Sequence, residues 1–370
     1  MPAIATNALQ GKLRTFLPLR KSRLETFCAL VLGVLISRTV NLSHLAALLP
    51  NRAQVGSNYR RLQRFLEQVS LDFKEIARFM VTCSGLNEGR WRLTMDRTNW
   101  KLGRLDVNIL MLGIVHQGVA IPLLWSMLDK RGNSNTSERI NLLKRFLALF
   151  GAERIISLLA DREFIGDAWL AWLHRHGISF HIRIRANIHI TNSLGRPVKA
   201  GELLRDLKVG GRRILRGKRR LGDGKKRTAP PLFVAATRLK TGELLIVVTN
   251  AKPDDALDQY AKRWEIETLF AAYKTRGFNL EDTHLVDPER IAKILAVLAV
   301  AFCWAHAVGE WKNAHKPIPI KKHGRRAASI FRHGLDELRR VLFQIFLFPS
   351  RNLRLPWGCQ IFPPCPPRTA

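Results

Sequence analysis

Apolar residues recur every three or four positions over residues 20–85, which is the spacing of amphipathic helices. This pattern predicts a set of short helices near the N-terminus. One of them carries three arginines on or near a single face: Arg60, Arg61 and Arg64. The segment is either a DNA-binding module with a basic face or an ordinary helical bundle with solvated arginines, and the pattern leaves both interpretations open.

Between residues 91 and 185 the pattern changes to short, nearly continuous apolar runs, which are typical of buried strands. Three consecutive strands are followed by a helix, a strand, a helix and a strand. This order predicts a mixed α/β sheet whose first strands are antiparallel. The predicted strands cover 91–96, 107–115, 119–124, 154–161 and 180–185, and the predicted helices cover 135–149 and the segment around 169–173.

Residues 188–250 are dense in glycine and basic residues. Two further strands, 232–239 and 243–249, are joined by Lys240-Thr241-Gly242 and predict a hairpin. The window 205–227 holds 11 Lys or Arg and 2 Asp, so its net charge is 11 − 2 = +9. This part of the chain predicts a β-rich insertion with a flexible basic loop.

The last third of the chain predicts two long helices and a tail. Residues 254–276 form an amphipathic pattern that ends at Gly277, and residues 288–312 are strongly apolar. Lys293 and His306 interrupt the apolar run, and a membrane-spanning helix needs roughly 18 or more apolar residues, so we expect a core helix. The expected domains are an N-terminal helical DNA-binding domain (1–88), the first part of a core (89–187), the β-rich basic insertion (188–250), the second part of the core (251–312) and a basic C-terminal tail (313–370).

Charge narrows the class of partner. The 370 residues include 61 Lys or Arg and 29 Asp or Glu, a formal net charge of +32, and 46% of the residues are hydrophobic. That apolar content excludes a disordered basic tail. A compact chain of this charge repels itself unless a polyanion neutralises it, so we expect nucleic acid as partner and an anionic membrane surface as the second candidate. Arg219 and Arg220, in the +9 window, join the N-terminal arginines as candidate DNA contacts.

Cysteine use and the N-terminus indicate the compartment. The five cysteines are widely spaced and form no CxxC pair, which argues against a zinc site or a disulfide framework. We expect buried free thiols in a reducing cytosol. The N-terminus lacks the pattern of a signal peptide, so a cytoplasmic location is expected.

Three acids form the candidate catalytic set. Asp96 and Asp161 each end an apolar strand, where a carboxylate projects from a rigid sheet. Glu267 lies on the predicted helix 254–276. Phosphodiester chemistry on DNA is served by two Mg²⁺ ions about 4 Å apart, and Mg²⁺ prefers oxygen ligands. Three carboxylates in this arrangement therefore favour a metal-dependent reaction on DNA.

The helix that carries Glu267 has a polar stripe. At about 100° per residue, Tyr260 and Lys274 each lie about 20° from Glu267 in projection, and Arg263 lies about 40° away. Such a stripe suits a face that holds a metal and contacts phosphates. The alternative is a solvated face with Arg263 and Glu267 as an i,i+4 ion pair.

These residues resemble a known family. The spacing Tyr260-x2-Arg263-x3-Glu267-x6-Lys274 matches the Y-(2)-R-(3)-E-(6)-K signature of IS4-type insertion-sequence transposases. Residues 94–100, with sequence TMDRTNW, and residues 159–166, with sequence LADREFIG, are similar to the motifs around the two aspartates of that family. The resemblance runs from about residue 90 to 310.

The resemblance implies an RNase H-like catalytic core interrupted by the β-rich insertion. It implies that Asp96, Asp161 and Glu267 hold Mg²⁺, which Mn²⁺ would replace, and that Tyr260, Arg263 and Lys274 contact phosphates near the cleaved end. It further implies recognition of transposon inverted-repeat ends by the N-terminal domain, strand transfer into target DNA, a homodimer in the synaptic complex and a bacterial, nucleoid-associated protein. No role for a membrane is expected.

Other interpretations stay open. The chain could be a metal-dependent endonuclease of the same fold that performs no strand transfer, or a catalytically silent DNA-binding repressor. Relatives carry a tryptophan in the insertion that assists hairpin formation, whereas no Trp lies between Trp172 and Trp264 here, so Phe180, Phe233 or a tryptophan elsewhere would have to replace it. Glu265 lies about 200° from Glu267 on the predicted helix and is not expected in the triad.

Overall fold

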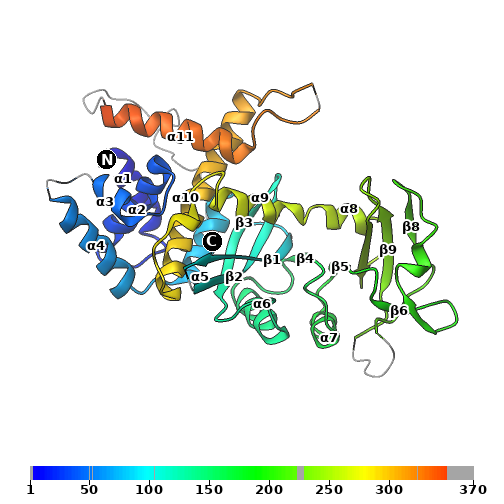
Figure 1. The fold of residues 1–370 in the computed structure, drawn as a ribbon. Helices are drawn as coiled ribbons and strands as arrows, with labels where there is room; N and C mark the ends of the chain where they lie inside the picture. Colours follow the sequence, from blue (N-terminus) through cyan, green and yellow to red (C-terminus); the bar gives the residue numbers. More distant parts are fainter. Residues whose placement is uncertain are drawn as a thin grey trace.

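The N-terminal helices form one end of the molecule (Figure 1). The structure is a computed structural model, and it describes residues 3–49, 51, 53–103, 105–222, 229–322 and 324–347. The helical pattern over residues 20–85 is confirmed, and an additional helix precedes it. These helices are α1 (Ala3–Leu13), α2 (Lys21–Ser37), α3 (Leu42–Ala47), α4 (Val55–Gln68) and α5 (Phe73–Cys83).

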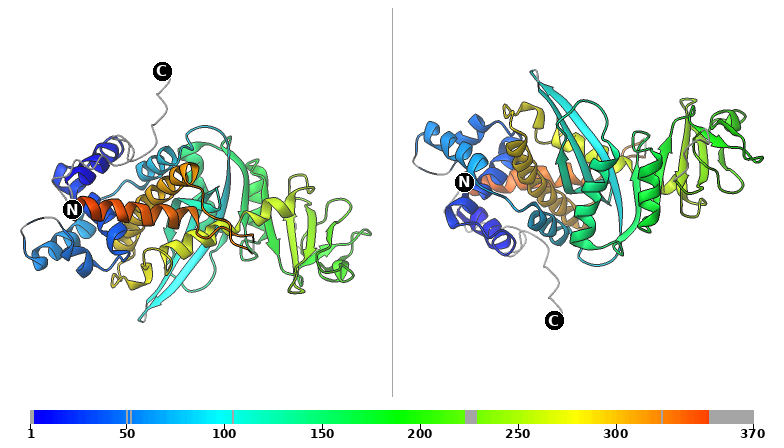
Figure 2. Two further views of the ribbon diagram at one scale, coloured as in Figure 1. Left: turned by 90° about the horizontal axis from the view of Figure 1, so that it is seen from above. Right: turned by 90° about the horizontal axis from the view of Figure 1, so that it is seen from below.

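A mixed sheet forms the centre of the fold, as the order of strands and helices predicts. Its first three strands are antiparallel neighbours, and β4 and β5 then add in parallel next to β1. Helices α6 and α7 lie on one side of this sheet. Helices α8 (Ala256–Ala261) and α9 (Trp264–Tyr273) lie on the other side (Figures 1 and 2). The elements are β1 (Trp91–Leu102), β2 (Leu105–His116), β3 (Val119–Met127), α6 (Thr136–Phe150), β4 (Ile155–Ala160), α7 (Asp167–Arg175) and β5 (Phe180–Ile184).

The insertion continues the sheet instead of forming a separate one. The predicted hairpin is present, and its second strand pairs with β5, so the sheet has the order β3-β2-β1-β4-β5-β10-β9-β8. Only β6 and β7 form a separate two-stranded sheet. Residues 223–228 of the predicted basic loop lie outside the described residues. The elements here are β6 (His189–Thr191), β7 (Pro197–Lys199), the 3₁₀ turn Glu202–Leu204, β8 (Arg212–Ile214), β9 (Phe233–Arg238) and β10 (Leu244–Thr249).

The predicted helix 254–276 is wrong as one continuous element. The structure has α8 (Ala256–Ala261) and α9 (Trp264–Tyr273), joined by a tight turn. In this turn the N–H of Arg263 bonds the carbonyl of Tyr260 at 2.9 Å, an i→i−3 bond that tightens the chain relative to an α-helix. The turn changes the direction of the side chains that follow it.

The long apolar helix is present as α10 (Pro288–His315) and is the central core helix. Of the described helices, it alone is long and apolar enough to cross a membrane, but 94% of its apolar window is buried within the protein. A core helix of a soluble protein passes the same test. The three cysteines in the described part, Cys28, Cys83 and Cys303, are buried free thiols.

The description of residues 313–370 as a tail is wrong for its first part. Ile330–Leu347 form α11, which packs along α10. The two backbones approach closely at Gly309 and Gly334, where a Cβ on Gly334 would lie 1.8 Å from the carbonyl oxygen of Ala305. Apolar side chains of α11, including Phe331 and Leu335, are buried in this contact. The proline-rich end of the chain lies outside the described residues.

Candidate active site

Strand pairing sets the two aspartates side by side. β1 and β4 are parallel neighbours with Met95 opposite Ala160, so Asp96 and Asp161 follow at the same level of adjacent strands. Both side chains are partly buried, and the side chain of Asp96 is 15% exposed. The sheet therefore presents two carboxylates at one point. Asp161 follows the end of β4, as predicted, whereas β1 continues to Leu102, so the prediction that Asp96 ends its strand is wrong.

The turn between α8 and α9 places three more polar side chains over the aspartates. The Oη of Tyr260 donates to Oδ1 of Asp161 at 3.0 Å. The Nη1 of Arg263 contacts Oδ2 of Asp96 at 3.1 Å, and its Nη2 forms an ion pair with Glu267. The Nε of Arg263 donates to the Oη of Tyr260 at 3.1 Å. Arg263 therefore contacts two of the three predicted acids, and Tyr260 connects it to the third, Asp161.

Burial shapes the electrostatics of this cluster. It raises the pKa of Asp96 to about 7, although Arg263 and the N–H of Arg97 act in the opposite direction. Burial, with Asp161 nearby, also raises the pKa of Tyr260, so the phenol keeps its proton. Burial opposes the charge on Arg263, yet its acidic neighbours hold its pKa above the ordinary value. The site thus consists of acids crowded around one buried cation, an arrangement in which further positive charge is favourable.

The chemistry of the donors fits a hard divalent cation. Asp96, Asp161 and Glu267 offer only carboxylate oxygens, which are the ligands that Mg²⁺ and Mn²⁺ prefer. Burial raises the pKa of the Asp96 carboxyl, and its ion pair with Arg263 offsets only part of that effect. A cation bound among these oxygens would add positive charge.

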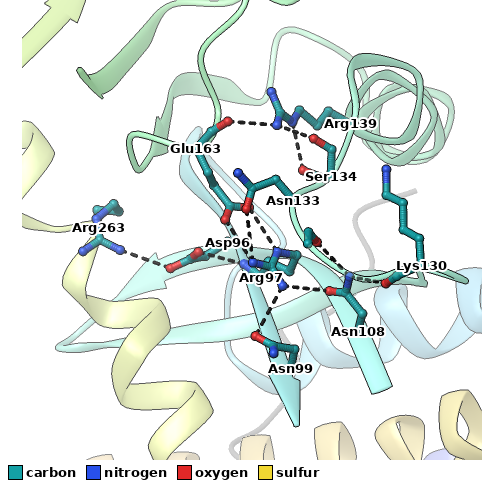
Figure 3. A network of polar contacts seen from close by, with 11 residues as sticks. Asp96, Arg97, Asn99, Asn108, Lys130, Asn133, Ser134, Arg139, Glu163 and Arg263 are labelled. Carbon is teal, nitrogen blue, oxygen red and sulfur yellow. Dashed lines mark hydrogen bonds and ion pairs between the residues drawn. The ribbon is translucent and has the colours of Figure 1, made fainter. Parts of the chain in front are cut away.

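Arg97 forms a second polar network beside Asp96 (Figure 3). Its guanidinium contacts both carboxylate oxygens of Glu163 at 3.4 Å and donates to Oδ1 of Asn108 at 3.1 Å. The Nη2 of Arg139 donates to the backbone carbonyl of Glu163 at 2.9 Å. Glu163 is therefore engaged with Arg97, next to the triad, and it fixes the loop that follows β4.

Lys274 does not join the polar stripe that the helical projection predicts. It follows the end of α9, and its Nζ donates to the carbonyl of Asn99 at 3.2 Å and pairs with Glu281 at 2.8 Å. The ammonium also lies 5.8 Å from the ring centroid of Trp100. It thus lies beside the end of β1, beyond the group formed by Tyr260, Arg263 and Glu267.

The arginines predicted to contact DNA differ in solvent exposure and in their hydrogen bonds within the protein. Arg60 and Arg64 are exposed on α4, whereas Arg61 turns inward and donates to Oγ1 of Thr26 at 2.9 Å. The Arg61 side chain is still 39% exposed, and contact of the three arginines with DNA stays a prediction. Arg219 and Arg220 are half-buried in the insertion, and Nη2 of Arg219 donates to the carbonyl of Arg216 at 2.8 Å.

The aromatic residues considered for base stacking differ in how far their side chains are exposed to solvent. Phe180 is fully buried in β5 and offers no face to DNA. Phe233 is partly buried, with the Nζ of Lys218 5.2 Å from its ring centroid. Trp264, next to Arg263 in the sequence, is 64% exposed. The chain thus has an exposed tryptophan outside the insertion, at the start of α9.

Glu265 takes no part in the triad, as its position on the helix predicts. Its Oε2 accepts a hydrogen bond from the backbone N–H of His116 at 2.7 Å, at the turn between β2 and β3. Three further residues next to this turn were not expected from the sequence to act together: His116, His306 and Glu310. His306 and Glu310 lie one helical turn apart on α10, and this spacing is the one feature of the sequence that could have indicated that they act together.

Comparisons with known proteins were made for the whole chain. A family model described as the transposase DDE domain matches residues 79–304, which is more than half of the chain and includes all three acids. Among solved structures, the cryo-EM structure of a piggyBac transposase synaptic complex with hairpin DNA is similar, with a TM-score of 0.44 and 13% sequence identity. That comparison covers 100% of this chain and 84% of the other. No curated protein matches.

Proposed function

The chain belongs to the family of the transposase DDE domain, and from this premise we propose that it is the DNA transposase of an insertion sequence. It cuts DNA at the inverted-repeat ends of the element and joins the freed ends to target DNA. The observation that carries the proposal is the convergence of Asp96, Asp161 and Glu267 from β1, the end of β4 and α9 within the matched domain.

Transposase domains of this family generally depend on a divalent metal ion. We propose Mg²⁺, with Mn²⁺ as a substitute, held by Asp96, Asp161 and Glu267. When bound, the ion supplies an activated water and neutralises charge on the scissile phosphate.

The remaining polar side chains orient these acids. Tyr260 holds Asp161 through its phenol, and Arg263 holds Asp96 and Glu267 through separate nitrogens. The planar guanidinium of Arg263 also has the geometry to donate two parallel hydrogen bonds to phosphate oxygens. Tyr260, Arg263 and Lys274 are therefore proposed to contact the DNA backbone near the cleaved end.

Binding of double-stranded DNA is proposed to rest on the basic surfaces outside the triad. Arg60 and Arg64 on α4 are free to contact DNA at the inverted repeats, and Arg219 and Arg220 would act in the insertion. Neutralisation of phosphates by such residues gives affinity that falls as salt rises. We further propose a homodimer in the synaptic complex, a cytoplasmic, nucleoid-associated protein and no membrane attachment.

The spacing of Tyr260, Arg263, Glu267 and Lys274 supports placement in the IS4 group. Two alternatives remain from the sequence: an endonuclease without strand transfer and a silent DNA-binding repressor. The intact set of acids, held by specific hydrogen bonds, favours an active enzyme over the repressor.

The first test is excision. The full chain is incubated with Mg²⁺ and a plasmid that carries the genomic segment flanking its gene on both sides, and the cleavage junctions are sequenced. We expect Asp161→Asn to abolish cleavage while DNA binding is retained, because the change removes a carboxylate without adding charge or bulk. Asp129→Asn, at an exposed acid, is the matched control and should cut normally. Full cleavage by Asp161→Asn would refute the assigned triad.

The second test separates a transposase from a nuclease. Duplexes that end at the sequenced junctions, already cleaved, are offered together with a supercoiled target plasmid. A transposase joins the 3′ ends to the target, whereas an endonuclease leaves both molecules unjoined. Joining that is absent with an enzyme active in excision would favour the endonuclease alternative.

A further inference from the structure

Two imidazoles and a carboxylate meet at a point separate from the triad. His116 ends β2, while His306 and Glu310 lie one turn apart on α10. The Nε2 of His116 lies 2.7 Å from Oε1 of Glu310, and the Nε2 of His306 lies 3.4 Å from the same oxygen. One ligand atom of each residue lies within 4.8 Å of the others.

The environment of His306 lacks hydrogen-bond partners for its ring. The residue is 1% exposed, and among the described residues neither ring nitrogen has a partner that meets hydrogen-bond geometry, although Nε2 lies 3.4 Å from Glu310. The ring stacks on Phe302, with an interplanar angle of 5°. A buried polar group without a partner costs free energy, so its presence calls for an explanation.

The donor set matches a transition metal better than Mg²⁺. Neutral imidazole nitrogens suit zinc and related ions, and two histidines with one glutamate are an established ligand combination for Zn²⁺. The side chains of His116 and Glu310 are 17% and 21% exposed, so solvent reaches one side of the cluster. Water could therefore serve as a further ligand to an ion held by these three residues.

We propose that His116, His306 and Glu310 form a Zn²⁺ site distinct from the carboxylate site. Its place in the fold gives it a structural role. The backbone N–H of His116 bonds Glu265 on α9, two residues before Glu267. A metal bound here joins the turn between β2 and β3 to α10 and, through Glu265, to the start of α9. It thereby fixes the helix that carries Glu267, and this inference does not depend on the reaction proposed above.

The test is direct metal binding by the full chain. The protein is stripped with EDTA and titrated with Zn²⁺ against a chromophoric chelator, and with Co²⁺, whose visible absorption reports the ligand field. We expect about one equivalent of Zn²⁺ bound, and an affinity at least ~10-fold weaker in Glu310→Gln and in His116→Gln. Glu289→Gln, which alters an exposed acid in the first turn of the same helix, should bind as the wild type does.

A second measurement covers the case in which a ligand variant does not fold. In the Asp96→Asn/Asp161→Asn background, which removes acids of the carboxylate site, Zn²⁺ should raise the Tm of the stripped protein, whereas Mg²⁺ should not. Failure of Zn²⁺ to bind the wild type, failure of Zn²⁺ to raise the Tm in this background, or unchanged affinity in a folded Glu310→Gln variant would overturn the proposal.

Discussion

Arg263 contacts two of the acids proposed to hold a metal ion, so its removal should destabilise the protein more without metal than with it. The side chain is only 10% exposed and contacts Asp96 at 3.1 Å, together with Glu267 and the phenol of Tyr260. Arg263→Met keeps most of the aliphatic stem and removes the charge. Without metal, the variant leaves Asp96 buried with no cation beside it.

The magnitude follows from the burial of this pair. Breaking a buried ion pair costs about 3–5 kcal/mol, and the 15% exposure of the Asp96 side chain favours the lower end, about 3 kcal/mol. At about 2.1 cal/mol/K per residue, a chain of 370 residues has an unfolding entropy near 0.8 kcal/mol/K. For a cooperative transition the Tm should therefore fall by about 4 °C.

The assay is thermal unfolding with EDTA and with saturating Mn²⁺. In the wild type the ion competes with Arg263 for Asp96 and Glu267, whereas in the variant it meets no such competitor. Mn²⁺ should therefore raise the Tm of the variant by more than that of the wild type, and the gap should narrow. Arg212→Met, which breaks an exposed ion pair with Asp258 on α8, is the matched control and should change little in either condition. The reasoning is refuted if the gap stays constant or widens on addition of Mn²⁺.

Two further predictions concern stability. Gly334→Ala should cost about 3 kcal/mol or more, because its Cβ would lie 1.8 Å from the carbonyl oxygen of Ala305 and would force α10 and α11 apart. Urea unfolding measures the loss, and Gly56→Ala, on a helix with open space around the new methyl group, should be neutral or slightly stabilising. Burial lowers the pKa of His181 to about 4, whereas the unfolded residue titrates near 6.5. Between those values the unfolded chain binds the extra proton, so stability should fall as pH drops from about 6.5 to 4, by up to about 3 kcal/mol. His181→Gln should show a smaller loss over this window in urea unfolding, and an identical pH slope would contradict the assignment.

The sequence predicts the core of the site because strand pairing obeys local rules. Asp96 and Asp161 each end an apolar run, and parallel neighbours place such residues at the same edge. The three antiparallel strands, the hairpin of the insertion and the capping box that begins α6 at Asn135 follow from comparable local signals. Each of these features is determined by residues that lie close together in the sequence, so a short stretch of sequence is enough to predict it.

The stripe on the predicted helix 254–276 failed because tertiary contacts changed its geometry. The guanidinium of Arg263 donates to Tyr260, Asp96 and Glu267. The turn around this residue has i→i−3 bonding, which a projection at 100° per residue cannot represent. Tyr260, Arg263 and Glu267 still meet, whereas Lys274, beyond the end of α9, departs from the stripe. The positions of these side chains depend on contacts with strands that are distant in the sequence, and a short stretch of sequence does not reveal such contacts.

The missed helix α11 had a signal in the sequence. Phe331, Leu335, Leu338 and Leu342 recur at helical spacing and are all buried. The basic, proline-containing residues before them obscured it, since composition indicated a tail. The cluster of His116, His306 and Glu310 had only a partial signal, because β2 and α10 are nearly 200 residues apart.

The shared sheet has a consequence for protein engineering. The insertion is joined to the core through the pairing of β10 with β5, from Ile246 opposite Ile184 to Thr249 opposite His181. Deleting residues 188–250 would strip β5 of its neighbour and leave an apolar strand with unpaired backbone groups, which invites aggregation. The insertion therefore cannot be exchanged as an independent cassette. A shortened chain that stays in solution would have to retain β10, or another strand that pairs with the edge of β5.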